Sequence, residues 1–183
     1  SRWGSSEYGG NHSAQYALSQ GRRLGFVGGT DNHLGQPGAG THGYNEGQGW
    51  VAVLAPELSR EAVYDAIKAR RCYATSGAKT LLFVTLGDQL MGSEITGWSG
   101  ERTLRITAAG ARPIDRLEVI RNGEVVYEEL PRSFTVDTAF EDTQPLEYKD
   151  AAFPSLPPFC YYYVRITQRD RRQAWSSPIW LSP

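Results

Sequence analysis

The stretch LEVIRNGEVVY, residues 117–127, decides the fold of the larger part of this 183-residue chain. Apolar residues alternate with polar ones on both sides of Asn122-Gly123. Because both central residues tolerate a positive φ, an Asn-Gly pair between two such runs favours a two-residue type I′ turn. The stretch therefore predicts a β-hairpin with one buried face.

The same period of two extends along the chain from about residue 80. The alternating apolar positions are Leu82 and Val84, Leu104, Ile106 and Ala108, Leu117 and Val119, Val125 and Tyr127, and Tyr162, Val164 and Ile166. About seven short strands in roughly 100 residues are typical of an antiparallel β-sandwich of immunoglobulin-like or fibronectin-like architecture. The Cys…Trp…Cys spacing of true immunoglobulin domains is missing, so the prediction concerns the architecture alone.

Residues 1–79 have a different pattern, with helical and strand segments in turn. We expect a short helix over 13–20 with Asn11 or Ser13 as its N-cap, a buried strand over 24–28 and another strand over 50–54. A second helix should begin near Ser59, whose hydroxyl can cap it, with an inner face of Ala62, Val63, Ala66 and Ile67. The fold class is thus α+β, with an α/β part at 1–79 and a β-sandwich at 80–183. A long glycine-rich loop is expected between Leu34 and Gly49.

Composition excludes several classes of function. The formal net charge is -1 and no run of like charge occurs, so nucleic acid is not an expected partner. No apolar stretch reaches the roughly 18 residues of a membrane span. Cys72 and Cys160 lie far apart in the sequence and are expected to be buried thiols.

Asp31 and His33 are the candidate metal ligands. They follow the predicted strand over 24–28, and at the carboxyl ends of strands α/β proteins assemble their sites. If the backbone stays extended, the spacing of two places both side chains on one side, so that a carboxylate and an imidazole converge on one ion. Gly28 and Gly29 would let other groups approach the backbone closely. The alternative is that Asp31-Asn32-His33 is only a structural turn.

Three further residues are weaker candidates for substrate binding or an accessory role. His42 lies in the glycine-rich loop and could reach a substrate, or it could be a solvated loop histidine. His12 lies beside the expected helix cap and could equally be structural. Glu7 could approach the metal site if the N-terminal loop folds inward; the alternative is an exposed position.

Four segments resemble the PHP (polymerase and histidinol phosphatase) superfamily. The sequence Gly-Phe-Val-Gly-Gly-Thr-Asp-Asn-His at 25–33 is similar to the segment that ends a late barrel strand in that superfamily with its last metal ligands. The other segments are 55–62, 69–77 and 174–180, and they resemble a branch in which a β-rich appendage follows the barrel, similar to carbaryl hydrolase. The resemblance implies the C-terminal portion of a distorted (β/α)7 barrel, followed by that appendage.

On this resemblance the intact parent is a metal-dependent phosphoesterase or related esterase that uses Mn, Zn or Fe. Asp31 and His33 would be ligands, and the metal would lower the pKa of a bound water to about 7. The family's site begins with a His-x-His pair, whereas this chain has three histidines, His12, His33 and His42, and no such pair. We therefore expect the chain to be a part of a longer enzyme and, by itself, to have little or no hydrolytic activity.

The rival hypothesis is a binding module without catalysis. In it the β-sandwich contacts a glycan or a protein partner, and the run Tyr161-Tyr162-Tyr163 could be a carbohydrate platform or, as alternating aromatics on a strand, part of a core. A further possibility is a homo-oligomer, because incomplete barrel elements would expose strand edges and apolar surface.

Overall fold

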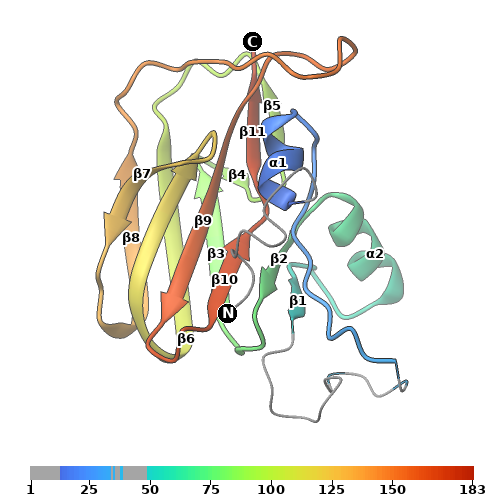
Figure 1. Cartoon of the computed structure of the whole chain (residues 1–183), viewed down its shortest axis with the longest axis vertical. Helices are drawn as coiled ribbons and strands as arrows, with labels where there is room; N and C mark the ends of the chain where they lie inside the picture. The colour runs from blue at the N-terminus through green and yellow to red at the C-terminus, as the bar shows by residue number, and fades with distance from the viewer. Residues whose placement is uncertain (1–12, 34, 36–37, 39–48) are drawn as a thin grey trace.

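The computed structural model describes residues 13–33, 35, 38 and 49–183 and is rich in β-structure (Figure 1). Two helices are present in the described part, α1 (Ala14–Ser19) and α2 (Arg60–Lys68). The strands are β1 (Trp50–Val53), β2 (Cys72–Thr75), β3 (Leu81–Leu86), β4 (Gln89–Leu90), β5 (Glu94–Thr96), β6 (Thr103–Arg121), β7 (Glu124–Glu129), β8 (Ser133–Glu141), β9 (Cys160–Gln168), β10 (Gln173–Ser176) and β11 (Ile179–Ser182).

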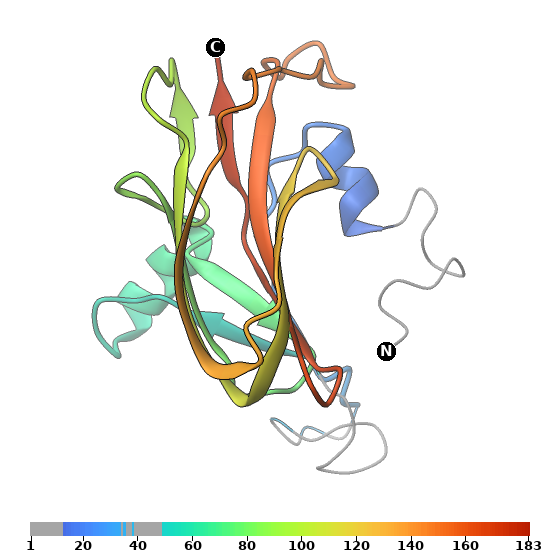
Figure 2. The same cartoon turned by 90° about the vertical axis from the view of Figure 1, so that its left-hand side faces the viewer.

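All eleven strands belong to one sheet, which curls around its own core (Figure 2). The main path runs β1-β2-β10-β9-β6-β3-β4, while β7 and β8 pair with β6 and β11 pairs with β9 and β5. Every pair is antiparallel except β5 with β11. β6 is 19 residues long and pairs with four strands, so its bends bring distant parts of the sheet face to face. This arrangement fits the predicted β-sandwich.

The main core lies inside the curl. Its side chains come from alternate positions of the strands, and buried examples are Leu82, Val84, Leu104, Ile106, Val119, Tyr162 and Val164. Burial of these apolar surfaces is the main favourable term that holds the sheet in its curled form.

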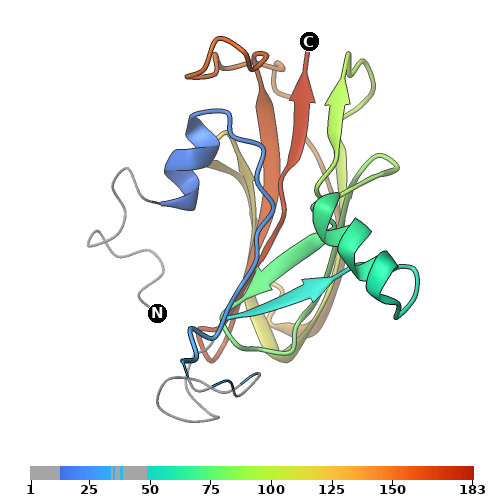
Figure 3. The same ribbon diagram turned by 90° about the vertical axis from the view of Figure 1, so that its right-hand side faces the viewer.

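A second, smaller core lies on the outer face of the sheet. Tyr161, Tyr163 and Trp180 project there, and Leu18 of α1 and Phe26 cover them. Figure 3 shows α1 and the segment after it lying along this side of the sheet. Because β9 is covered on both faces, all three adjacent tyrosines are buried, and the core interpretation of Tyr161-Tyr162-Tyr163 is confirmed.

Several local predictions are confirmed. Asn122 and Gly123 have φ of 51° and 92°, as a type I′ turn requires, and they connect β6 to β7. Ser13 and Ser59 cap α1 and α2 by accepting from the amides of Tyr16 and Ala62. The strand expected over 50–54 is β1.

Other local predictions are wrong. Residues 24–28 do not form a strand, because their described backbone groups join no ladder; the segment instead crosses the outer face of the sheet. β2 was not predicted, since all four of its residues are buried and no alternation marks it. On α2 only Ala66 of the predicted inner face is fully buried, and Ile67 is 43% exposed.

The predicted boundary at residue 79 falls inside the continuous sheet. β1 and β2 join it through β10, which pairs Trp175 with Ala74. α2 connects β1 to β2, yet these strands are antiparallel, whereas a barrel repeat has parallel strands. The described residues thus show a β-rich fold and no barrel, and the division at 79 stays a prediction.

Candidate functional site

Asp31 and His33 lie at the end of the segment that crosses the outer face. The Nε2 atom of His33 is 3.4 Å from Oδ1 of Asp31, so the two side chains lie close together. The backbone reason is different from the expected one, because Asp31 has a φ of 54° and is therefore not extended. Asp adopts the left-handed backbone conformation more readily than most residues do.

The donor atoms of this pair suit a shared divalent ion. The 3.4 Å separation of Oδ1 and Nε2 is that of a long hydrogen bond or ion pair between the two side chains. Both side chains are open to solvent, at 90% and 78% exposed. A carboxylate and an imidazole are ligands that Mn, Zn and Fe accept.

The remaining candidates cannot be placed beside this pair. His42, His12 and Glu7 all lie outside the described residues. Within the described ranges no group of three or more His, Cys, Asp or Glu side chains could hold a metal ion. Asp31 and His33 are thus a pair of potential ligands and no more than a pair in that part of the chain.

Residues 22–33, here called the site-bearing segment, follow a path that is set by close backbone contacts. A Cβ atom on Gly28 would lie 2.5 Å from the carbonyl oxygen of Trp50, and one on Gly49 would lie 2.8 Å from that of Gly29. These distances are too short for any side chain, so glycine at 28 and 49 lets the segment cross the start of β1. The predicted close approach is thus present at Gly28, whereas a Cβ on Gly29 would meet nothing within 4 Å.

Buried polar contacts fix the first half of the segment, and sequence reasoning missed them. The amide of Phe26 donates to Oγ of Ser177 at 2.9 Å, and the same hydroxyl donates to the carbonyl of Cys72 at 2.6 Å. The Arg23 guanidinium stacks on Trp180 at 4.4 Å and donates to Oγ of Ser182 at 3.1 Å. No local signal could have shown these pairs, because the members of each pair are more than 100 positions apart in the sequence.

Charges around Arg23 are partly balanced. Glu94 pairs with Arg23 at 3.6 Å and also with Arg70. Burial lowers the pKa of the Arg23 guanidinium, the nearby Glu94 opposes that shift, and Arg70 adds to it. Lowering an arginine pKa from so high a value leaves the group charged at neutral pH, so it is a lasting cation for stacking on Trp180.

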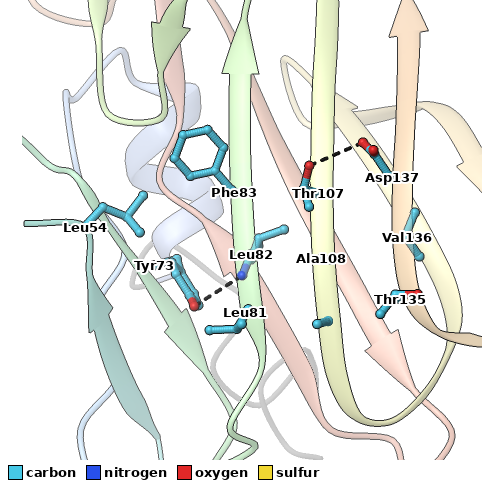
Figure 4. Close-up of a pocket in the computed structure, with 11 residues that line it drawn as sticks. Leu54, Tyr73, Leu81, Leu82, Phe83, Thr107, Ala108, Thr135, Val136 and Asp137 are labelled. Atoms are coloured by element: carbon cyan, nitrogen blue, oxygen red, sulfur yellow. Dashed lines mark hydrogen bonds between the residues drawn. The ribbon is translucent and has the colours of Figure 1, made fainter.

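A separate feature is an apolar hollow of about 420 Å3 on the flank formed by β3, β6 and β8 (Figure 4). Its walls include Leu54, Tyr73, Leu82, Ala108, Val136 and Asp137. The Tyr73 hydroxyl donates to the carbonyl of Thr80 and accepts from the amide of Leu82, so it is already used. Asp137 faces Thr107 at 3.4 Å. The hollow could accept an apolar group, with few polar atoms to orient it.

Comparison with known proteins shows sequence relatives of unestablished role. A family model described as "protein of unknown function (DUF3604)" matches residues 40–101, a region that includes β1 to β5 and crosses residue 79. An uncharacterized protein of Chlamydia pneumoniae is 36% identical over 139 residues, which are 73% of this chain and 22% of the relative.

Two more relatives cover more of the chain. Uncharacterized proteins of Chlamydia muridarum and Chlamydia trachomatis are 31% and 30% identical over 173 residues, 90% of this chain and 28% of each relative. The chain thus spans about a quarter of the length of the curated relatives it matches. No solved structure gives a significant match. Neither described helix is long and apolar enough to cross a membrane.

Proposed function

We propose that this chain is the C-terminal part of a longer metal-dependent hydrolase of the PHP type, which acts on phosphoester or other ester bonds. In this proposal Asp31 and His33 supply two of the metal ligands, and residues 1–79 are the C-terminal part of the metal-binding domain. The convergence of Oδ1 and Nε2 at 3.4 Å carries the proposal.

The greater length of the relatives supports the idea of a larger parent. In them roughly three quarters of the polypeptide lies outside the matched region. Two protein ligands hold an ion weakly, so the site requires further ligands from parts of the protein other than those described here. A bound divalent ion would supply a hydroxide nucleophile near neutral pH and neutralise charge on the developing oxyanion.

The contribution of this chain's own residues follows from their exposure and chemistry. The Asp31 carboxylate brings negative charge, and the His33 imidazole offers a ring nitrogen as a second ligand atom. Both groups face solvent, which leaves room for a substrate and for other ligands.

Binding of Mn2+ followed by NMR tests the proposal, because a paramagnetic ion broadens signals even when it binds weakly. We expect amide signals around Asp31 and His33 to broaden selectively in the wild-type chain, and Asp31→Ala or His33→Ala to abolish the effect. Asp88→Ala, which removes another exposed carboxylate, serves as the control. Broadening that survives both site variants would overturn the proposal. The isolated chain should not hydrolyse a model phosphodiester with Mn2+ present.

The second candidate function is the binding module, and the apolar hollow is the observation that favours it. A glycan platform built on Tyr161-Tyr162-Tyr163 is excluded, because each of these side chains is at most 3% exposed. The hollow would instead take an apolar group of a protein or small molecule. An apolar dye should shift the NMR signals of Leu82 and Val136 in the wild-type chain if the hollow binds such groups. That shift, together with no selective Mn2+ broadening at Asp31 and His33, would favour the module.

A further inference from the structure

The β-rich part of the chain contacts the site-bearing segment directly. The strands β10 and β11 and the corner between them lie under residues 23–26, as Figure 3 shows for the segment that descends from α1. We propose that Ser177 and Arg23 are positioning residues that clamp this segment to the outer face of the sheet, and so fix where Asp31 and His33 are presented. The role for the metal pair rests on the proposed function.

Ser177 is the central contact of the clamp. Its side chain is fully buried, and its hydroxyl uses both its donor and an acceptor site, toward the carbonyl of Cys72 and from the amide of Phe26. Three separate chain segments therefore meet at one hydroxyl. Without the hydroxyl, the amide of Phe26 and the carbonyl of Cys72 would lose a partner in a poorly hydrated place, which costs more than an exposed hydrogen bond.

Arg23, three residues before Phe26, makes the second contact of the clamp. Its side chain is 11% exposed, stacks on Trp180, and reaches Ser182 and Glu94. The flat guanidinium suits both the aromatic face and the two oxygen acceptors, which a lysine ammonium cannot match together. Its neighbour Arg22 instead lies over Phe153 and is exposed.

Packing completes the clamp between these polar contacts. The ring of Phe26 meets Tyr163 edge-to-face, with centroids 5.5 Å apart and an interplanar angle of 83°. A Cβ on Gly25 would lie 3.0 Å from Arg70 and 3.3 Å from Oγ of Ser177, so the backbone itself is tightly seated. With Gly28 against Trp50, the segment is held at 23, 26 and 28 before it reaches Asp31.

Hydrogen exchange on the full chain tests the clamp independently of any metal. Ser177→Ala should accelerate exchange of the amides over 24–29 about fivefold to tenfold, while amides of β9 and β6 keep their rates. Ser176→Ala is the matched control, because Ser176 is equally buried but accepts from Val164 within the sheet. If both variants change the same amides, or if neither affects 24–29, the clamp is wrong.

Arg23 variants give a second, graded readout. Arg23→Ala should raise exchange over 24–29 as Ser177→Ala does, Arg23→Lys should restore part of the protection, and Arg22→Ala should leave it unchanged. An Arg23→Lys variant as fast as Arg23→Ala, together with an equal effect of Arg22→Ala, would contradict a positioning role.

The Mn2+ measurement separates the two proposals. Broadening near His33 that weakens severalfold in Ser177→Ala, but not in Ser176→Ala, supports both. Faster exchange without any Mn2+ effect in the wild-type chain keeps the clamp and removes the metal site. Unaltered exchange over 24–29 in Ser177→Ala with normal Mn2+ broadening removes the clamp and keeps the metal site.

Discussion

Asp142 shows how a single buried carboxylate can order one end of the sheet. Its side chain is 1% exposed and accepts from the Tyr162 hydroxyl at 2.6 Å, Arg121 at 2.8 Å and the amide of Gln144 at 3.1 Å. Arg102 lies 3.8 Å away and also donates to Tyr162. These partners compensate the cost of burying the Asp142 charge. Without the carboxylate, the arginines and the Tyr162 hydroxyl would be left without their acceptor.

Replacement of Asp142 should therefore be costly. We expect Asp142→Ala to lower the free energy of unfolding by about 3 kcal/mol, because it leaves two partly buried arginines without their carboxylate. Asp137→Ala, at an exposed position, should change it by less than about 0.5 kcal/mol. Urea denaturation of both variants checks this, and equal losses would show that the network contributes little.

Burial of the Cys160 thiol leads us to predict that the protein loses stability at alkaline pH. Burial raises the pKa of its thiol from 9.0 to about 11, and burial likewise raises the pKa of Cys72 and of Tyr162. The folded state thus keeps these protons longer than the unfolded state, so the contribution is complete below pH 9 and declines as pH rises toward 11. Unfolding free energies measured from pH 7 to 10.5 should fall, and Cys160→Ala should flatten that slope; an unchanged slope would argue against burial of the thiol.

At the scale of elements, turns and helix caps could be predicted from the sequence, whereas the pairing of distant strands could not. The Asn122-Gly123 turn and the Ser13 and Ser59 caps depend on residues within three positions of each other, so the sequence contains the whole signal. β2 is buried on both faces and shows no alternation. The segment over 24–28 has the apolar composition of a buried strand, yet Leu24 is 37% and Val27 is 64% exposed, and Phe26 is the large side chain that packs on the sheet.

The candidate site divides in the same way. The closeness of Asp31 and His33 is a local feature, since the two residues are two positions apart, whereas the extended backbone predicted there is wrong because Asp31 is left-handed. Ser177 and Arg23 contact their partners across more than 100 residues, and a serine or an arginine has no pattern that marks such a partner.

The hairpin between β6 and β7 gives the element-scale prediction. Gly123 has a φ of 92°, and a Cβ there would have 3.5 Å of space to the nearest atom, the Tyr161 hydroxyl. The cost of Gly123→Ala is thus conformational, and we expect a loss of about 1–2 kcal/mol in urea denaturation. Gly100→Ala is the control, because Gly100 has no such φ and its nearest neighbour is also 3.5 Å away. Equal stability of the two variants would show that the turn tolerates a different geometry.

At the scale of the molecule, the sheet joins parts of the chain that composition separates. β2 lies between β1 and β10, so residues before 79 are paired with residues near the C-terminus. Leu18 and Phe26 cover Tyr161, Tyr163 and Trp180 on the outer face. Residues 80–183 would therefore lack a sheet neighbour for β10 and a cover for three large aromatic side chains.

Removal of residues 1–79 tests whether the β-rich part is an independent unit. We expect the 80–183 fragment to have a lower urea midpoint than the full chain, and to bind a hydrophobic dye, because the exposed edge of β10 and the uncovered aromatic face favour association. Circular dichroism and tryptophan fluorescence of the full chain should change together in one transition, since one sheet carries both probes. A monomeric fragment with the midpoint of the full chain would instead support a boundary at 79, and the contacts of Phe26 and Leu18 would then be a docking of two separately stable units.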